Sequence, residues 1–155
     1  MKKVLALLMA VCLFAFAAGC GDSNEGPEVD VAALAAELAA ADIFDDIVSE
    51  MPAELAPRFY SYDGADVVTC ALYQSTLAAA EEVFVAECTD HDAAERVMEA
   101  CDGRVEEQIT AYESYVPAEI PKLESAILLT VGDYVIFVVS NNTDAAQQIV
   151  DGYLK

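Results

Sequence analysis

The sequence is poor in the side chains that carry most enzyme chemistry. His91 is the only histidine among 155 residues, so a Ser–His or Cys–His catalytic pair would have to use it. The sequence contains no Gly-x-Ser-x-Gly nucleophile elbow, no glycine-rich phosphate loop, no dinucleotide fingerprint and no EF-hand spacing. We therefore expect a protein that is not an enzyme, with no catalytic residues and no cofactor.

Positive charge is also scarce, and part of it lies at the very start. Lys2 and Lys3 precede an apolar run from Val4 to Ala18 that no charged residue interrupts. A helix of this length rises about 22 Å, which is less than the hydrocarbon core of a bilayer at about 30 Å. The run is typical of a cleaved signal peptide, and no later stretch is long enough to cross a membrane.

The apolar run ends in Ala17-Ala18-Gly19-Cys20, which resembles the lipobox of bacterial lipoproteins. In that class the cysteine becomes the first mature residue and carries a diacylglycerol, and a further acyl chain such as palmitate makes the anchor stable. Ordinary secretion after Ala15-Phe16-Ala17 is the alternative. We expect a signal peptide over 1–19, lipidated Cys20 with a flexible tether over 20–29, and a single domain over 30–155. The protein would then lie on the extracytoplasmic face of the cell membrane.

The mature chain would be strongly acidic. Five basic residues follow Cys20 against 28 acidic ones, which gives a formal charge of −23. Such a surface repels nucleic acid and anionic lipid, and it attracts cations or basic partners. The expected partners are therefore the membrane, through the lipid, and an envelope protein or a cation. A solvated surface without a dedicated partner remains the simpler interpretation of the charge.

Three cysteines remain after the signal peptide and Cys20 are set aside, namely Cys70, Cys88 and Cys101. An odd number allows at most one internal disulfide, and the sequence has no CxxC or zinc-like spacing. All three lie among apolar residues, which favours buried free thiols. A bridge from Cys101 to one of the others is the alternative.

Hydrophobic periodicity predicts an amphipathic helix first and strands later. One apolar stripe runs from Asp30 to Met51, where Pro52 ends it, although two shorter helices meeting near Asp42 fit almost as well. Gly132-Asp133 predicts a hairpin turn between the last two strands. The expected strands are Val67–Tyr73, Glu82–Cys88, Ser125–Val131 and Tyr134–Ser140, with helices from Asp92 to Tyr112 and from Asp144 to Leu154.

An internal similarity organises these elements. Val83–Met98 aligns without a gap with Val135–Val150, and each copy is a strand, a polar turn and a helix start. This predicts an α+β fold in which a leading helix precedes two hairpin-plus-helix units, forming a four-stranded antiparallel sheet with helices on one face. Chance similarity between two short turns is the alternative. The residues expected to cap the helices are Asp92 with Glu95 and Asp144 with Gln147.

The turn around the single histidine is the only weak candidate for a metal site or a general base. It contains Asp90, His91, Asp92 and Glu95. The equivalent turn, 141–144, keeps an aspartate but lacks the Asp-His pair, so helix capping is the favoured role. The adjacent acid pairs Asp45-Asp46, Glu81-Glu82 and Glu106-Glu107 carry little information in so acidic a chain.

Two stretches, EEVFVAECTDHDAAERV and YESYVPAEIPKLESAILLTVGDYVIFVVS, resemble the small bacterial lipoproteins that carry the domain of unknown function numbered 4358. The family's order of signal peptide, lipobox, amphipathic helix and domain matches the one above. The resemblance implies no catalytic or binding residues. We therefore expect a membrane-anchored, non-catalytic binding or assembly module. A lipoprotein that binds a small ligand or a divalent cation is the alternative, and an enzyme is the least favoured.

Overall fold

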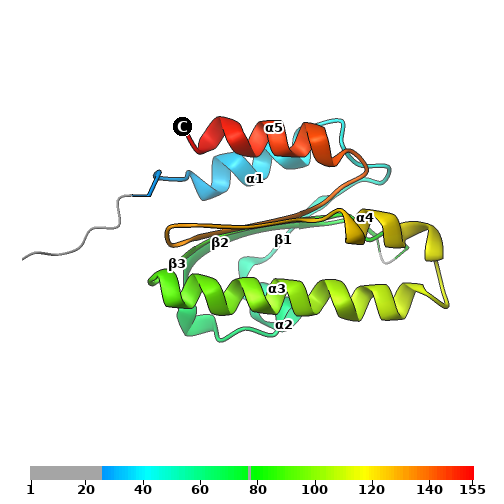
Figure 1. Cartoon of the computed structure of the whole chain (residues 1–155), viewed down its shortest axis with the longest axis horizontal. Helices are drawn as coiled ribbons and strands as arrows, with labels where there is room; N and C mark the ends of the chain where they lie inside the picture. Colours follow the sequence, from blue (N-terminus) through cyan, green and yellow to red (C-terminus); the bar gives the residue numbers. More distant parts are fainter. Residues whose placement is uncertain (1–25, 77) are drawn as a thin grey trace, which may run out of the picture.

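The fold is built on one five-stranded antiparallel sheet in the order β1-β2-β3-β5-β4 (Figure 1). The computed structural model describes residues 26–76 and 78–155, so the expected signal peptide and the expected lipidation site at Cys20 lie outside the described residues. The strands are β1 (Ser49–Met51), β2 (Val67–Gln74), β3 (Glu82–Cys88), β4 (Ile127–Val131) and β5 (Tyr134–Val139). Gly132 has a φ of 56° and begins the expected two-residue turn between β4 and β5.

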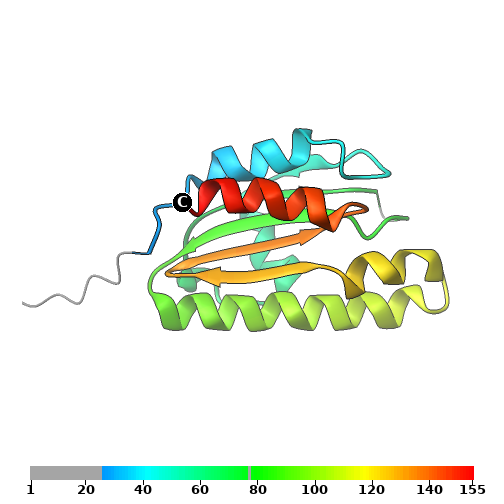
Figure 2. The ribbon, with the colours of Figure 1, turned by 45° about the horizontal axis from the view of Figure 1, so that its top comes forward.

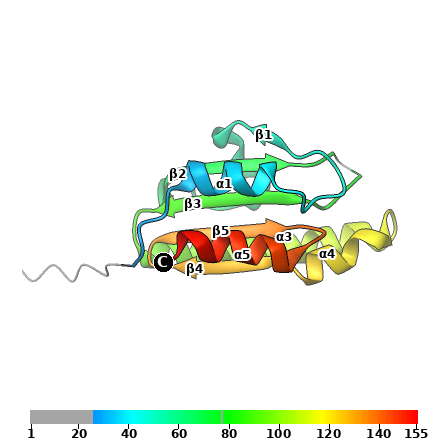
Figure 3. The ribbon, with the colours of Figure 1, turned by 90° about the horizontal axis from the view of Figure 1, so that it is seen from above.

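Helices cover both faces of this sheet. The helices are α1 (Val31–Ala40), α2 (Ala56–Tyr60), α3 (His91–Tyr112), α4 (Ile120–Glu124) and α5 (Thr143–Tyr153). Figure 1 shows α1 and α5 on one face and α2 and α3 on the other, and Figure 3 shows α1 above β2 and β3. Within the described part of the chain, no helix is both long and apolar enough to span a membrane.

The α+β class is confirmed, but the expectations of four strands and of helices on one face are wrong. Successive residues of the central strands alternate between two cores, so that Phe84 and Phe137 pack under α3 while Val83 and Ile136 pack under α1 and α5. A strand with apolar side chains on both faces is buried on both, and each face then needs a covering layer. The strand that was not expected is β1, which lies in the segment expected to be helical.

The leading helix is shorter than its apolar stripe. Asp30 caps α1 by accepting a hydrogen bond from the Ala33 amide at 3.0 Å, as expected for a helix that begins there. The helix ends at Ala40, however, and neither the long helix nor the pair of helices meeting near Asp42 forms. The backbone N–H groups of Asp45 and Asp46 instead donate to the Glu81 carboxylate, which holds this segment as a loop.

Both later helices begin earlier than expected, so the predicted caps are wrong. Asp90 accepts from the Ala93 amide at 2.8 Å, and Asn142 accepts from the Ala145 amide at 3.1 Å. Asp92 and Asp144 lie in the first turn, where a negative charge favours the helix dipole. The residues predicted to complete these caps make other contacts. Glu95 lies 3.6 Å from His91, and Gln147 donates a hydrogen bond to Asp151.

The two similar segments have the same order of strand, turn and helix, but they face opposite sides of the sheet. Val83 and Val135 correspond in the alignment, yet they lie in the two different cores. The helices that follow them, α3 and α5, accordingly cover opposite faces of the sheet. What the two segments share is therefore the strand-to-helix transition.

The three cysteines of the described chain are free, as the favoured interpretation predicted. Cys88 and Cys101 are buried, and Cys70 is half-buried. Burial, together with the charge of the nearby Asp66 carboxylate, raises the pKa of the Cys88 thiol to about 12. These thiols are therefore protonated and unreactive at neutral pH.

Candidate functional site

The turn selected from the sequence opens onto a groove between α3 and β4. Figure 2 shows these two elements side by side along one edge of the molecule. The groove has a volume of about 530 Å³. It is lined by His91, Glu95, Met98, Glu99 and Asp102 from α3 and by Leu128 and Thr130 from β4.

His91 lies at one end of this groove and joins α3 to the β4–β5 turn. Its Nδ1 donates to the Gly132 carbonyl at 2.9 Å, and its Nε2 lies 3.6 Å from a Glu95 carboxylate oxygen. The hydrogen bond to Gly132 raises the pKa of His91, and the charge of Glu95 adds to this effect. The imidazole is thus held against the β4–β5 turn by a backbone hydrogen bond.

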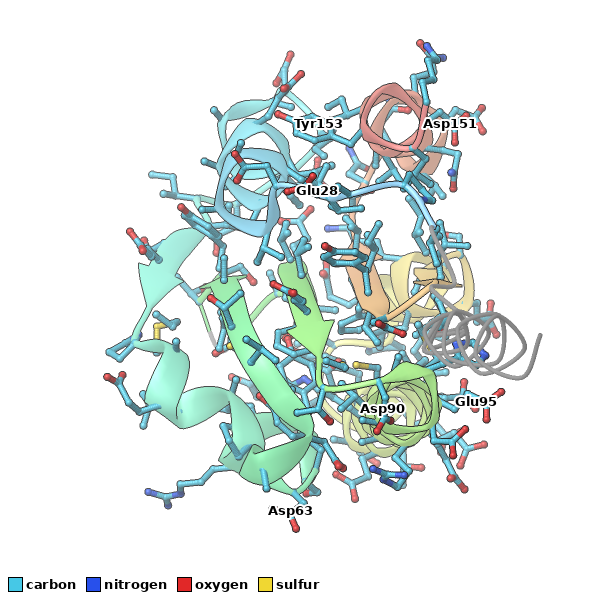
Figure 4. The ribbon with its side chains drawn as sticks, turned by 90° about the vertical axis from the view of Figure 1, so that its left-hand side faces the viewer. Glu28, Asp63, Asp90, Glu95, Asp151 and Tyr153 are labelled. Atoms are coloured by element: carbon cyan, nitrogen blue, oxygen red, sulfur yellow. The ribbon has the colours of Figure 1, made fainter. Side chains whose placement is uncertain are left out.

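The four residues of the weak metal candidate do not converge. The structure brings His91 and Glu95 together, but Asp90 is occupied as the helix cap. Figure 4 looks toward the start of α3 and shows Asp90 and Glu95 at separate places around the helix. Across residues 26–76 and 78–155, no three His, Cys, Asp or Glu side chains are grouped so as to hold a metal ion.

A second polar centre lies at the start of β3, where Glu81 and Glu82 are each only 1% exposed. Glu82 faces α3 and receives hydrogen bonds from Arg104 Nε and Nη2, both at 2.8 Å. Gln74 Nε2 donates to the same carboxylate at 3.0 Å, and the Tyr60 hydroxyl lies within 3.3 Å. Both oxygens of this buried carboxylate therefore accept hydrogen bonds from the Arg104 guanidinium.

Glu81 points to the opposite face and forms a separate network. It accepts from Lys122 Nζ at 3.0 Å, in addition to the amides of the loop after α1. Lys122 also contacts Asp45 at 2.9 Å and Glu119 at 3.1 Å. Burial alone would lower the pKa of Lys122, but the hydrogen bonds to these three carboxylates raise it above its usual range. The network therefore joins three segments that lie far apart in the sequence, namely the loop after α1, the start of β3 and the region of α4.

A small cavity of about 60 Å³ adjoins Glu82. Its walls include Ser75, Arg104, Gln108 and Tyr112, and the Gln108 Oε1 atom is buried without a hydrogen-bond partner among the described residues. A cavity of this size and polarity can hold a few water molecules or one very small polar ligand. Sequence reasoning missed this centre because Glu81-Glu82 is one of several acid pairs. The position of Glu81-Glu82 at the start of a mainly apolar strand could have indicated that these carboxylates are buried.

These features lie within a domain shared with other proteins. Residues 41–140 match the family described as Domain of unknown function (DUF4358). The chain belongs to this family. The family assignment made from the sequence is thereby confirmed, and the match includes the sheet, the α3–β4 groove and both buried glutamates.

This DUF4358 protein contains two helices outside the matched region, because α1 ends at Ala40 and α5 begins at Thr143. The two helices that cover one face of the sheet, α1 and α5, therefore lie before and after the matched region in the sequence. No curated protein and no solved structure matches the chain.

Proposed function

We propose that this DUF4358 protein is a lipid-anchored, non-catalytic module that presents its domain at the extracytoplasmic face of the cell membrane for binding or assembly. The observation that supports this proposal is the point at which the chain enters the domain. Gly26 passes against Gly132 of the β4–β5 turn, at the end of the sheet where α5 also finishes (Figure 2). The Glu81 network lies toward the other end, with the loop after α1 and with α4.

The distance from the proposed anchor to the domain is short. Gly26 follows Cys20 by six positions, and an extended chain spans at most about 21 Å over six residue steps. The domain would therefore stay close to the bilayer, with the β4–β5 turn toward the lipid and α4 away from it. A charge of −23 would keep it from lying flat on anionic lipid.

The polar centres support binding better than catalysis. His91 is hydrogen-bonded to a backbone carbonyl, and Glu82 is neutralised by Arg104. Binding of a small ligand is the second candidate function, and the observation that favours it is the unpartnered Gln108 Oε1 atom beside the 60 Å³ cavity. The acidic turn around His91 does not favour a divalent-cation site, because its carboxylates diverge.

Labelling with palmitate tests the anchor. We expect the wild-type protein to incorporate label and to remain with the membrane fraction, and Cys20→Ala to lose the label and accumulate as precursor or in the medium. Cys12→Ala is the matched control, because it removes a thiol from the same leader without touching the proposed attachment site. Wild-type protein found in the medium with an unmodified N-terminus would overturn the proposal.

A further inference from the structure

The two edges of the sheet are protected to very different degrees. The edge strand β1 has three residues, contains Glu50 and is followed by Pro52, and such short, charged edges resist pairing with other strands. The edge strand β4 reads Ile-Leu-Leu-Thr-Val and contains neither a charge nor a proline. Among the described residues β4 pairs only with β5, so the backbone groups of its outer side have no strand partner.

The groove beside this open edge combines an apolar floor with an acidic rim. Met98 and Leu128 are half-buried within it. Glu95, Glu99 and Asp102 recur at steps of four and three residues, which places them on one side of α3, and all three are exposed. Among residues 26–76 and 78–155, no lysine or arginine lines the groove. Arg96, on the same helix, is instead paired with Asp66.

We propose that β4 and this groove bind an extended basic segment of a partner protein, which adds to the sheet as a further strand. Its backbone would hydrogen-bond to the outer side of β4, and its lysine or arginine side chains would lie against Glu95, Glu99 and Asp102. A basic extended segment is thus the partner of the proposed binding module, a pairing that rests on that module's binding role and does not depend on acylation of Cys20.

Charge decides between the possible occupants of the edge. A second copy pairing through β4 would bring two acidic α3 rims together, between two chains of formal charge −21 each, and repulsion opposes this. The same rim repels nucleic acid and anionic lipid. A basic extended segment satisfies both the unpaired backbone and the acidic rim.

The test uses the full chain purified from whichever fraction of the expressing cells contains it, membrane extract or medium. The probe is a capped, fluorescent Lys-Val-Lys-Val-Lys-Val-Lys peptide, and the control peptide has the same charge with two valines replaced by proline. We expect the probe to bind at least about tenfold more tightly than the proline peptide, since proline lacks the N–H that a strand must donate. We also expect binding to weaken in 0.5 M NaCl, where the Debye length falls to about 4 Å.

Two charge reversals on α3 locate the interaction. Glu99→Lys should weaken probe binding by about tenfold or more, because it reverses a charge at the groove. Glu107→Lys is the matched control, since Glu107 is exposed on the same helix but does not line the groove, and it should change binding by less than about threefold. Equal effects of the two variants, equal binding of the two peptides, no binding, or dimers of the protein through β4 in sedimentation would each overturn the proposal.

Discussion

Glu81 and Glu82 are neighbours in the chain, yet each serves a different layer of the molecule. Alternation along a strand sends one carboxylate toward the α1–α5 face and the other toward α3. Removing a carboxylate from water costs several kcal/mol, and only a well-placed cation with further hydrogen bonds offsets this cost. Lys122 and Arg104 fill that role, and Arg104 also lies 5.1 Å from the centre of the Tyr60 ring.

The stability of the fold should therefore depend on Arg104, the cation beside Glu82. We expect Arg104→Met to lower the free energy of unfolding by about 3–5 kcal/mol, because it leaves a buried carboxylate without its cation. Urea denaturation followed by circular dichroism measures this loss. The double variant Glu82→Gln with Arg104→Met should recover part of the stability, because the uncompensated charge is then gone.

Arg96→Met is the control for this experiment. Arg96 pairs with Asp66 while its own side chain is 55% exposed, and exposed pairs contribute only about 0–1 kcal/mol. A loss at Arg104 no larger than the loss at Arg96 would show that the Glu82 centre does not stabilise the fold.

At the scale of the elements, the start of α3 allows two aspartates, Asp90 and Asp92, to be compared directly. We expect Asp90→Ala to cost about 1 kcal/mol of stability, because the Ala93 amide loses its acceptor. Asp92→Ala should cost less, about 0.5 kcal/mol, since only a favourable charge in the first turn is removed. Urea denaturation of both variants provides the measurement, and a larger cost at Asp92 would contradict the cap position described here.

The strands were largely predictable because their signal is local. The range Glu82–Cys88 was predicted with the bounds that the structure has, since β-branched and aromatic residues cluster there. The continuous apolar run in β5 also contained the sign that both faces are buried. The end of α1 was not predictable in this way, because the amides of Asp45 and Asp46 bond to a residue that follows much later in the chain.

The candidate sites show the same limit. His91 and Glu95 were selected from the sequence, and they do line a groove. The other wall of this groove is β4, which is separated from α3 in the chain by α4. The cap predictions were wrong for a simpler reason. Asp-x-Asp and Asn-x-Asp each contain two residues that can cap a helix. Arg104 and Lys122 could not be assigned to Glu82 and Glu81 before the packing of α3 and α4 was known.

For the whole molecule, the excess of acidic residues should make stability depend on salt. Self-repulsion among exposed carboxylates opposes the compact state, and ions screen it. We expect a higher melting temperature in 0.5 M NaCl than in a low-salt buffer, measured by thermal denaturation. Potassium chloride should act equally, since screening does not depend on the cation. An unchanged melting temperature would contradict this expectation.

The three free thiols have a consequence for how the protein matures. Cys88 and Cys101 are sheltered from solvent, and burial raises the pKa of each, so neither readily forms the thiolate that oxidation requires. An exported chain with this fold would reach its native state without help from thiol oxidoreductases. Reducing agents would leave its folding and stability unchanged.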